Sequence, residues 1–242
     1  MTGASAAGPA DRASGAVRTD RTDRADRADR ADRADRADGA APWGSEVAGV
    51  TQAGPDDLVA LSAMIAAAFC DLPPSRWLIG DEAARRAIFP GYFLIYLEHA
   101  LSAGVVLTTA DRSAAALWLP VGSGGPAAPD DYERRLAAVT APWTARFTAF
   151  DAELDRRHPA GRPHCHLALL GVGPGRQCRG TGSALLRAGH QMLDATGTPV
   201  YLEAASERSR RLYRRHGYAD LGPPLVLPGG PPMFPMWREG PK

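Results

Sequence analysis

Cysteine is scarce in this sequence, and long apolar runs and an excess of charge of either sign are missing. Only Cys70, Cys165 and Cys178 occur in 242 residues, and no two of them form a Cys-x-x-Cys pair. Such a sparse, odd set argues against a disulfide framework and fits a reducing compartment, so we expect a cytoplasmic protein. No apolar run approaches the roughly 20 residues of a membrane-spanning helix, and the first residues lack the apolar stretch of a secretory signal.

The charges nearly cancel. The chain has 28 Lys and Arg residues against 27 Asp and Glu residues, a formal net charge of +1. The basic residues are dispersed rather than gathered into one stripe, which argues against a nucleic-acid partner. We therefore expect neither nucleic acid nor a membrane as a partner. For the oligomeric state we expect a monomer or a homodimer.

Residues 1–44 differ from the rest of the chain, because Asp-Arg-Ala repeats with a period of three from Asp20 to Asp38. The repeat has no apolar face, so it cannot bury enough surface to offset the entropy of ordering. Asp and Arg four residues apart would support at most a solvated helix. We predict a low-complexity tail over 1–44, disordered or a lone helix, and one domain over 45–242.

From Glu46 onward, apolar spacing predicts a mixed α/β domain. The predicted elements are a strand over 46–53, a helix over 55–70, a helix from Asp81 broken by Pro90, a helix over 91–102, a hairpin over 104–119, helices over 130–139 and 143–157, strand 164–172, helix 180–195, strand 200–204, helix 206–216 and strand 233–238. The break at Pro90 is expected because proline lacks the N–H that an interior helical position donates.

The segment Leu170–Ser183 has the features of an anion-binding turn. A strand is predicted to end at Val172, and a Pro/Gly-rich turn leads directly into an amphipathic helix. Gly180 and Gly182 stand at the start of that helix, where the missing side chain lets backbone amides approach a ligand. Amides at a helix N-terminus lack intrahelical partners and favour negative charge, so the segment suits phosphate or pyrophosphate.

Two other phosphate-binding loops fit this segment poorly. A Walker loop requires a lysine after its last glycine, whereas Thr181 follows Gly180. A dinucleotide fingerprint would lack its third glycine. Glu203 stands where a ribose-binding acid belongs, but it lies too near the C-terminus for the remaining strands of a doubly wound fold.

The same segment resembles motif A of the GCN5-related N-acetyltransferase (GNAT) family, Gln/Arg-x-x-Gly-x-Gly/Ala. Residues 177–182 are Gln-Cys-Arg-Gly-Thr-Gly. Downstream, Val-Tyr-Leu-Glu-Ala-Ala from Val200 is similar to the next strand of the family. Ser-Arg-Arg-Leu-Tyr-Arg-Arg-His-Gly-Tyr from Ser209 is similar to its Asn-x-x-Leu-Tyr-x-x-x-Gly-Phe helix. Ser209 replaces the usual asparagine and Tyr218 the usual phenylalanine.

Within the family, the chain looks like the puromycin N-acetyltransferase-like actinobacterial members. The matching features are Ala67-Ala-Phe69-x-Asp71-x-Pro73-x-x-Arg76, Leu117-Trp118 and a helical insertion before His164. The resemblance covers Glu46 to Trp237 and is close only in the second half.

The resemblance implies a GNAT fold, an α/β fold with a central mixed, mostly antiparallel twisted sheet flanked by helices. It implies acetyl-CoA as cosubstrate, attacked directly by a primary amine in a ternary complex. The cofactor contacts that it implies are Leu170, Gly171, Val172, Gln177, Cys178, Arg179, Gly180, Thr181, Gly182, Ser183 and Ser209.

The resemblance also points to catalytic residues. Tyr213 matches the tyrosine that protonates the departing thiolate, although a tyrosine here could also simply pack the helix. The base that neutralises the amine stays open between Glu203, which ends the strand beside the expected cleft, and His166. The alternative role for Glu203 is a salt bridge with a neighbouring arginine.

The sequence indicates metal ligands and contacts to the acceptor substrate less clearly than it indicates the cofactor contacts. His164 and His166 share one face of a strand, but a closed zinc site needs four ligands and no second cluster supplies them, so we expect no metal. Asp71 and Trp118 are expected to contact the substrate, because an acid and an aromatic ring suit a cationic amine. The alternative is that such aromatic residues fill the core.

The expected function is therefore transfer of an acetyl group from acetyl-CoA to a primary amine of a small molecule. That molecule would be an aminonucleoside-type antibiotic, in a resistance role, or a metabolite that is being tailored. Two alternatives remain open: acetylation of a peptide or protein amine, and a non-catalytic module that binds coenzyme A.

Overall fold

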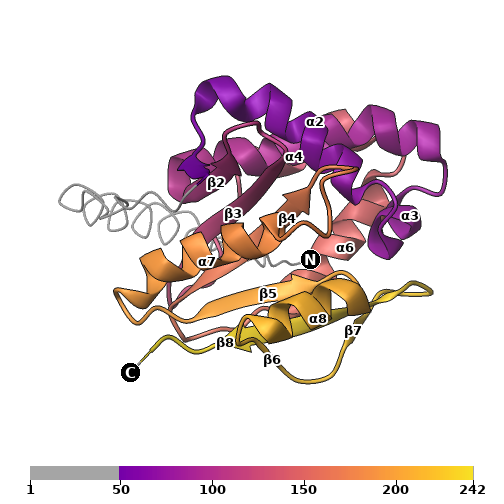
Figure 1. Ribbon diagram of the computed structural model, residues 1–242. Helices are drawn as coiled ribbons and strands as arrows, with labels where there is room; N and C mark the ends of the chain where they lie inside the picture. The colour runs from indigo at the N-terminus through magenta and orange to yellow at the C-terminus, as the bar shows by residue number, and fades with distance from the viewer. Residues whose placement is uncertain (1–48, 242) are drawn as a thin grey trace, which may run out of the picture. The chain divides into compact units, whose positions relative to one another are not determined.

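The computed structural model describes residues 49–241, so the predicted tail lies outside the described residues. The described chain forms a twisted sheet with helices on both faces (Figure 1). The strand order is β1-β2-β3-β4-β5-β8-β6, with β7 paired to β8. Every pairing is antiparallel except the one between β4 and β5. This is the predicted mixed, mostly antiparallel sheet.

The elements follow one another as expected for an α/β domain. They are β1 (Val50–Gln52), η1 (Pro55–Asp57), α2 (Leu58–Phe69), α3 (Pro73–Leu78), α4 (Glu82–Ala103), β2 (Val105–Thr109), β3 (Ala114–Val121), α5 (Tyr132–Thr140), α6 (Thr144–Arg157), β4 (His164–Val172), α7 (Thr181–Asp194), β5 (Val200–Ala204), α8 (Glu207–Arg215), β6 (Ala219–Asp220), β7 (Leu225–Val226) and β8 (Pro232–Arg238). No helix among the described residues has the length and apolar character needed to cross a bilayer.

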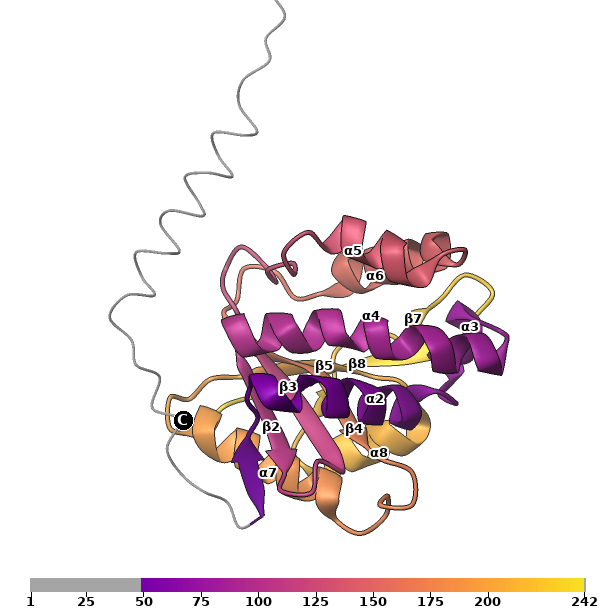
Figure 2. The same cartoon turned by 90° about the horizontal axis from the view of Figure 1, so that it is seen from above.

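The sheet separates two apolar cores, with α2 and α4 over one face and α7 and α8 over the other (Figure 2). On β3, Ala114, Ala116 and Trp118 pack in the core with α7 and α8. Ala115 and Leu117 pack in the opposite core with α2, α4, α5 and α6. The division follows from the period of two along a strand.

The prediction that Pro90 ends a helix is wrong. Helix α4 runs from Glu82 to Ala103 with Pro90 inside it. An interior proline costs about 3 kcal/mol. Phe89, Tyr92 and Phe93, on either side of the proline, are buried and contact one another with ring centroids 5.1–6.4 Å apart. Because each buried aromatic side chain contributes about 1.5–3 kcal/mol, their burial outweighs the cost of the proline.

The predicted hairpin and the predicted helices and strands of the second half are confirmed to within a few residues. Strands β4 and β5 have the predicted bounds. Strand β1 is shorter than expected, and helix α3 and the short strands β6 and β7 were not predicted. Each of these three has six residues or fewer, too short for a clear period in the sequence.

Trp118 is a core residue and is only 2% exposed. Its ring lies against Gly189 of α7, where an added Cβ would stand 2.1 Å from Trp118 Cζ2. The glycine thus lets the helix approach the sheet closely enough to cover the ring. Trp118 therefore packs the core rather than an acceptor pocket, and we do not retain it as a substrate contact.

Candidate active site

Strands β4 and β5 separate after two residue pairs. Their parallel pairing is confined to Cys165–Val200 and His166–Tyr201, although β4 continues to Val172. Beyond this point, the peptide groups of β4 that face β5 have no strand partner. The two strands therefore separate, and the separation leaves backbone donors and acceptors of β4 for a ligand.

A β-bulge in β4 determines toward which face of the sheet each residue at the separated end of the strand points. Leu117 of β3 pairs with Leu169 and Trp118 pairs with Leu167, so Ala168 is the extra residue. Before the bulge Leu167 packs in the core with α7, and after it Leu170 does so. The bulge thus turns Leu170 and Val172 toward the core on the α7 side, while Gly171 faces α2.

The separated strands open into a cavity of about 390 Å³. Its walls come from α2, β4, the turn before α7, the start of α7, the end of β5 and α8. The residues lining it include Phe69, Leu72, Leu167–Val172, Arg176–Cys178, Gly180–Ser183, Glu203, Ala205, Ser206, Arg208, Ser209, Leu212, Tyr213 and Arg215. Ten of the eleven expected cofactor contacts therefore surround one cavity; Arg179 is not part of its lining.

The turn before α7 has the conformation of an anion-binding loop. Cys178 and Gly180 both have positive φ, at 63° and 85°. Gly180 is the N-cap of α7 and makes no side-chain cap, so the first amides of the helix are left for a ligand. The Gln177 side chain donates to the Val172 carbonyl at 3.2 Å and ties the turn to the end of β4.

Positive charge gathers at the rim of the cavity. Arg176, Arg208 and Arg215 all contribute to the lining. Arg208 Nη2 lies 2.9 Å from Cys178 Sγ, which connects α8 to the turn before α7. Since a helix N-terminus also favours negative charge, this end of the cavity suits a phosphate-bearing ligand.

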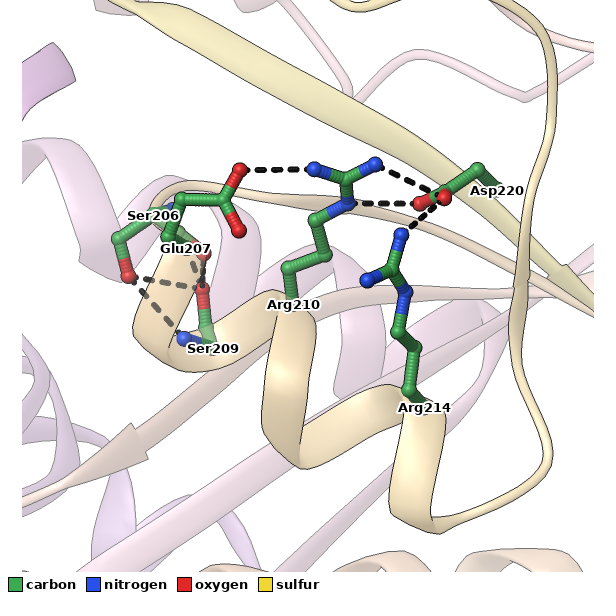
Figure 3. A network of polar contacts seen from close by, with 6 residues as sticks. All are labelled: Ser206, Glu207, Ser209, Arg210, Arg214 and Asp220. Atoms are coloured by element: carbon green, nitrogen blue, oxygen red, sulfur yellow. Dashed lines mark hydrogen bonds and ion pairs between the residues drawn. The ribbon is translucent and has the colours of Figure 1, made fainter.

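Ser209 holds the start of α8. Its Oγ accepts a hydrogen bond from the Ser206 backbone N–H at 3.1 Å, and Ser206 Oγ accepts from the Ser209 N–H at 3.1 Å (Figure 3). This reciprocal cap satisfies two helix-terminal amides. The Ser209 hydroxyl is thus engaged within α8, although the residue lines the cavity.

The outer face of α8 is fixed to the sheet by an ion-pair network. Arg210 contacts Glu207 and both carboxylate oxygens of Asp220, and Arg214 also contacts Asp220 (Figure 3). The Arg210 guanidinium also lies over the Phe234 ring, 4.4 Å from its centroid. Because α8 also carries Tyr213, these contacts help to hold that side chain at the cavity.

Tyr213 lines the cavity and is 7% exposed. Its ring packs edge-on against Tyr218, and its hydroxyl makes no hydrogen bond within residues 49–241. Burial raises the pKa of Tyr213 well above its ordinary value, so the phenol keeps its proton at neutral pH. The hydroxyl is therefore available to donate to a ligand in the cavity.

Glu203 and His166, the two candidate bases, form one pair. His166 Nε2 lies 3.0 Å from Glu203 Oε2, while Glu203 Oε1 is buried and has no hydrogen-bond partner among residues 49–241. Burial by itself raises the pKa of Glu203, but the charge and hydrogen bond of His166, together with the Tyr201 hydroxyl and His158, outweigh it and leave that pKa below its usual range. No salt bridge joins Glu203 to an arginine among the described residues.

Two more histidines lie beside this pair. The His158 ring centroid is 5.0 Å from that of His166 and 4.8 Å from that of Tyr201. His158 Nε2 is 3.0 Å from His164 Nε2, and His164 Nδ1 is 2.7 Å from the Arg162 carbonyl. Burial lowers the pKa of His158 to about 4, so it is neutral at physiological pH.

Asp71, the other expected substrate contact, does not line the cavity. Its side chain is 64% exposed and pairs with Arg76 at 3.3 Å and with Arg85 at 3.7 Å. Phe69, two residues earlier, does line the cavity. Asp71 thus compensates the exposed guanidinium of Arg76 and the buried one of Arg85, and we do not retain it as a substrate contact.

Sequence reasoning missed His158, Arg208 and Arg215. His158 ends α6 and approaches His166 only through the fold. The two arginines belong to an arginine-rich helix in which the cavity-facing positions cannot be told from the sequence alone.

The described residues fit the coenzyme A that the sequence leads us to expect. The unpaired end of β4 offers peptide groups to an extended amide-bearing chain, and the uncapped start of α7 offers amides to a pyrophosphate. At Gly182 an added Cβ would meet Val172 and Leu212 only at 3.6–3.8 Å, so the helix start stays open toward the cavity.

Comparison with known proteins agrees with this fit. Residues 142–218 match the model of the Acetyltransferase (GNAT) family, and this range contains most of the cavity lining. A solved structure titled histone acetyltransferase HPA2 and related acetyltransferase, from Corynebacterium glutamicum, is similar, with 25% identity and a TM-score of 0.57. The alignment covers 80% of this chain and 96% of that one.

Two further solved structures share the fold at lower identity. One is the C-terminal condensation domain of Ebony with β-alanyl-dopamine, with 10% identity, a TM-score of 0.54 and coverage of 78% of this chain and 97% of that one. The other is mosquito arylalkylamine N-acetyltransferase like 5b, with 15% identity, a TM-score of 0.51 and coverage of 78% and 98%. Over residues 142–218 the chain is thus similar to the GNAT family, and the solved structures share its fold.

Proposed function

We propose that this protein transfers the acetyl group of acetyl-CoA to a primary amine of a small molecule, by direct attack in a ternary complex. The observation that carries the proposal is the separation of β4 from β5 beside a cavity that is lined by both the start of α7 and Glu203. The helix start offers amides to phosphates, and Glu203 offers a buried carboxylate. An anionic cosubstrate and an amine can therefore meet between the strands.

The chain would hold acetyl-CoA through backbone groups. Amides at the start of α7 and the arginines at the rim bind the phosphates, and the unpaired peptide groups of β4 bind the extended arm. A β4 amide that points at the thioester oxygen stabilises the negative charge that develops there during attack. This arrangement orients the carbonyl toward the Glu203 end of the cavity.

Glu203 and His166 would prepare the amine. The amine arrives protonated and must be neutral to attack, so it needs a proton acceptor. Glu203 lines the cavity, and its Oε1 makes no hydrogen bond within the described residues, whereas Oε2 is held by His166. The ionised carboxylate first binds the ammonium and then takes its proton at Oε1.

Tyr213 would assist departure of the sulfur. Its hydroxyl is protonated at neutral pH and has no other hydrogen-bond partner among the described residues. A low-dielectric cavity that raises the phenol pKa also makes a thiolate more basic, so donation from the hydroxyl to the departing sulfur stays favourable.

The acceptor is tested by measuring thiol release from acetyl-CoA with a panel of amines and a no-acceptor control. The panel includes puromycin, because residues 46–237 resemble puromycin N-acetyltransferase-like proteins, most closely in their second half. It includes an arylalkylamine and a lysine peptide, because similar structures are titled arylalkylamine N-acetyltransferase and histone acetyltransferase. Turnover that requires a small amine supports the proposal. Turnover with the peptide alone contradicts it, as does acetyl-CoA binding without any turnover.

The state of the three cysteine thiols supports a location in the cytoplasm. Cys70, Cys165 and Cys178 are all free, and Cys178 is exposed in the turn before α7. A thiol in that position is best preserved in a reducing environment, so we place the enzyme in the cytoplasm.

A further inference from the structure

Three metal-binding side chains converge where β4 and β5 separate. One donor atom each from His158, His166 and Glu203 lies within 4.8 Å of the other two. The three residues come from the end of α6, from β4 and from β5, so only the folded chain brings them together. Two imidazoles and a carboxylate, with room for a further ligand, are the donor set of open zinc sites in proteins.

The distance between the donor atoms of His166 and Glu203 suits a bound ion. His166 Nε2 and Glu203 Oε2 are 3.0 Å apart. Two ligands bound at 2.0–2.1 Å to a tetrahedral ion stand about 3.3 Å from each other. The same geometry therefore accommodates either a shared proton or, after a small adjustment, a cation in the place of that proton. His166 then carries its remaining proton on Nδ1.

Glu203 has an unused oxygen for such an ion. Its side chain is 6% exposed, and Oε1 is buried without a hydrogen-bond partner. A buried acceptor left unsatisfied costs about 1–3 kcal/mol, more when the group is charged. A cation that binds both oxygens of the carboxylate would remove this cost.

His164 supplies the outer support that metal-binding histidines usually have. Its Nδ1 donates to the Arg162 carbonyl at 2.7 Å, so its Nε2 is an acceptor. His158 Nε2, 3.0 Å away, then donates to it and leaves Nδ1 of His158 with a free lone pair. Partners of this kind fix the tautomer and orientation of a ligating imidazole.

We propose that His158, His166 and Glu203 form a binding site for a divalent transition-metal ion, with Zn²⁺ the best match to the donors, and that the bound ion inhibits acetyl transfer. The inhibition rests on the proposed function, because an ion on His166 and Glu203 occupies the groups that would bind and deprotonate the amine. No metal was expected from the sequence, since nothing in it links His158 to the His164–His166 pair.

Metal binding is tested without turnover. The full chain, purified without a histidine tag and stripped of metal, is titrated with Zn²⁺ by calorimetry and with Co²⁺ by visible absorption. We expect one saturable ion per chain and the absorption of a four-coordinate cobalt site. His158→Ala should weaken binding at least about tenfold. His99→Ala, a histidine replacement on α4 outside the group, should leave binding unchanged, and thermal melts without metal check that both variants fold.

Absence of saturable binding, or equal affinity in wild type and His158→Ala, overturns the site. Inhibition is tested with an accepted amine: Zn²⁺ should inhibit the wild type, a chelator should restore it, and His158→Ala should be active and resist Zn²⁺. Binding without inhibition overturns the regulatory half of the proposal. Failure of every amine would contradict the proposed function while leaving the binding result intact.

Discussion

The His166 imidazole and the Glu203 carboxylate form a 3.0 Å hydrogen bond at the point where β4 and β5 separate. The bond fixes one carboxylate oxygen, while the other is buried and makes no hydrogen bond within the described residues. It also helps to keep the pKa of this buried carboxyl below its usual range, so that the group is ionised at neutral pH. A buried, ionised carboxylate that has a hydrogen-bond partner on only one of its oxygens within the described residues is suited to bind an ammonium group.

Glu203→Gln should lower kcat/KM by about 10²-fold or more, because glutamine keeps the shape but neither binds the ammonium by charge nor takes its proton. The loss should shrink as pH rises, since more of the amine is then already neutral. Steady-state kinetics across pH provide the measurement. The matched control is Glu82→Gln, which removes an exposed carboxylate of α4 outside the cavity and should keep near-normal activity. Equal activity of both variants would exclude Glu203 as the base.

Tyr213→Phe should reduce kcat by about 10- to 100-fold with little change in acetyl-CoA affinity, because only the proton donor to the sulfur is lost. The ring still packs against Tyr218. The defect should be smaller with a thioester whose thiol is more acidic, since that leaving group needs less help. Unchanged turnover with acetyl-CoA would leave Tyr213 a packing residue only.

Gly189→Ala should destabilise the fold by about 2 kcal/mol. The new methyl group would meet the Trp118 ring at 2.1 Å, and overpacking of a core costs about 1–3 kcal/mol. Gly91→Ala, also inside a helix, is the control. Its Cβ would lie 3.4 Å from Val139, so better helix propensity should leave it neutral or up to about 1 kcal/mol more stable. Urea unfolding compares the two, and equal stability would mean that α7 can withdraw from Trp118.

Asp151→Asn should make stability less dependent on pH. Burial raises the pKa of Asp151 to about 6, and Tyr132 donates to its carboxylate at 2.8 Å. With the folded pKa above the unfolded one, the folded state binds more protons, so wild-type stability falls as pH rises from about 4 to 6. Asparagine stays neutral and accepts the same bond. The variant should therefore gain up to about 2 kcal/mol at pH 7.5 and nothing near pH 4. A uniform gain across pH would contradict this.

The second half of the fold was predictable because its signals are local. The Gly/Pro turn between a strand and an amphipathic helix requires only neighbouring residues, and β4 and β5 have the predicted bounds. The predicted break at Pro90 is wrong because residues distant in the chain bury the aromatic side chains beside it. Local propensity gives no measure of that burial.

The cofactor side of the site was also more predictable than the acceptor side. Motif residues from 177 to 183 lie next to one another in sequence and therefore in the turn. The role of Trp118 depended on which face of β3 it occupies, and the approach of His158 to Glu203 depended on the path of α6. Both are fixed by packing over long sequence distances, which no periodic pattern encodes.

The most direct test of the account is the affinity for acetyl-CoA of Gly182→Glu, measured by calorimetry beside wild type and Gly182→Ala. Space around Gly182 tolerates a side chain, and an acid suits the first turn of a helix, so the variant should fold with unchanged or higher thermal stability. Its carboxylate would stand where the phosphates bind, and affinity should fall by about 10²-fold or more, with Gly182→Ala in between. Full affinity in a folded Gly182→Glu protein would contradict the placement of acetyl-CoA in this cavity.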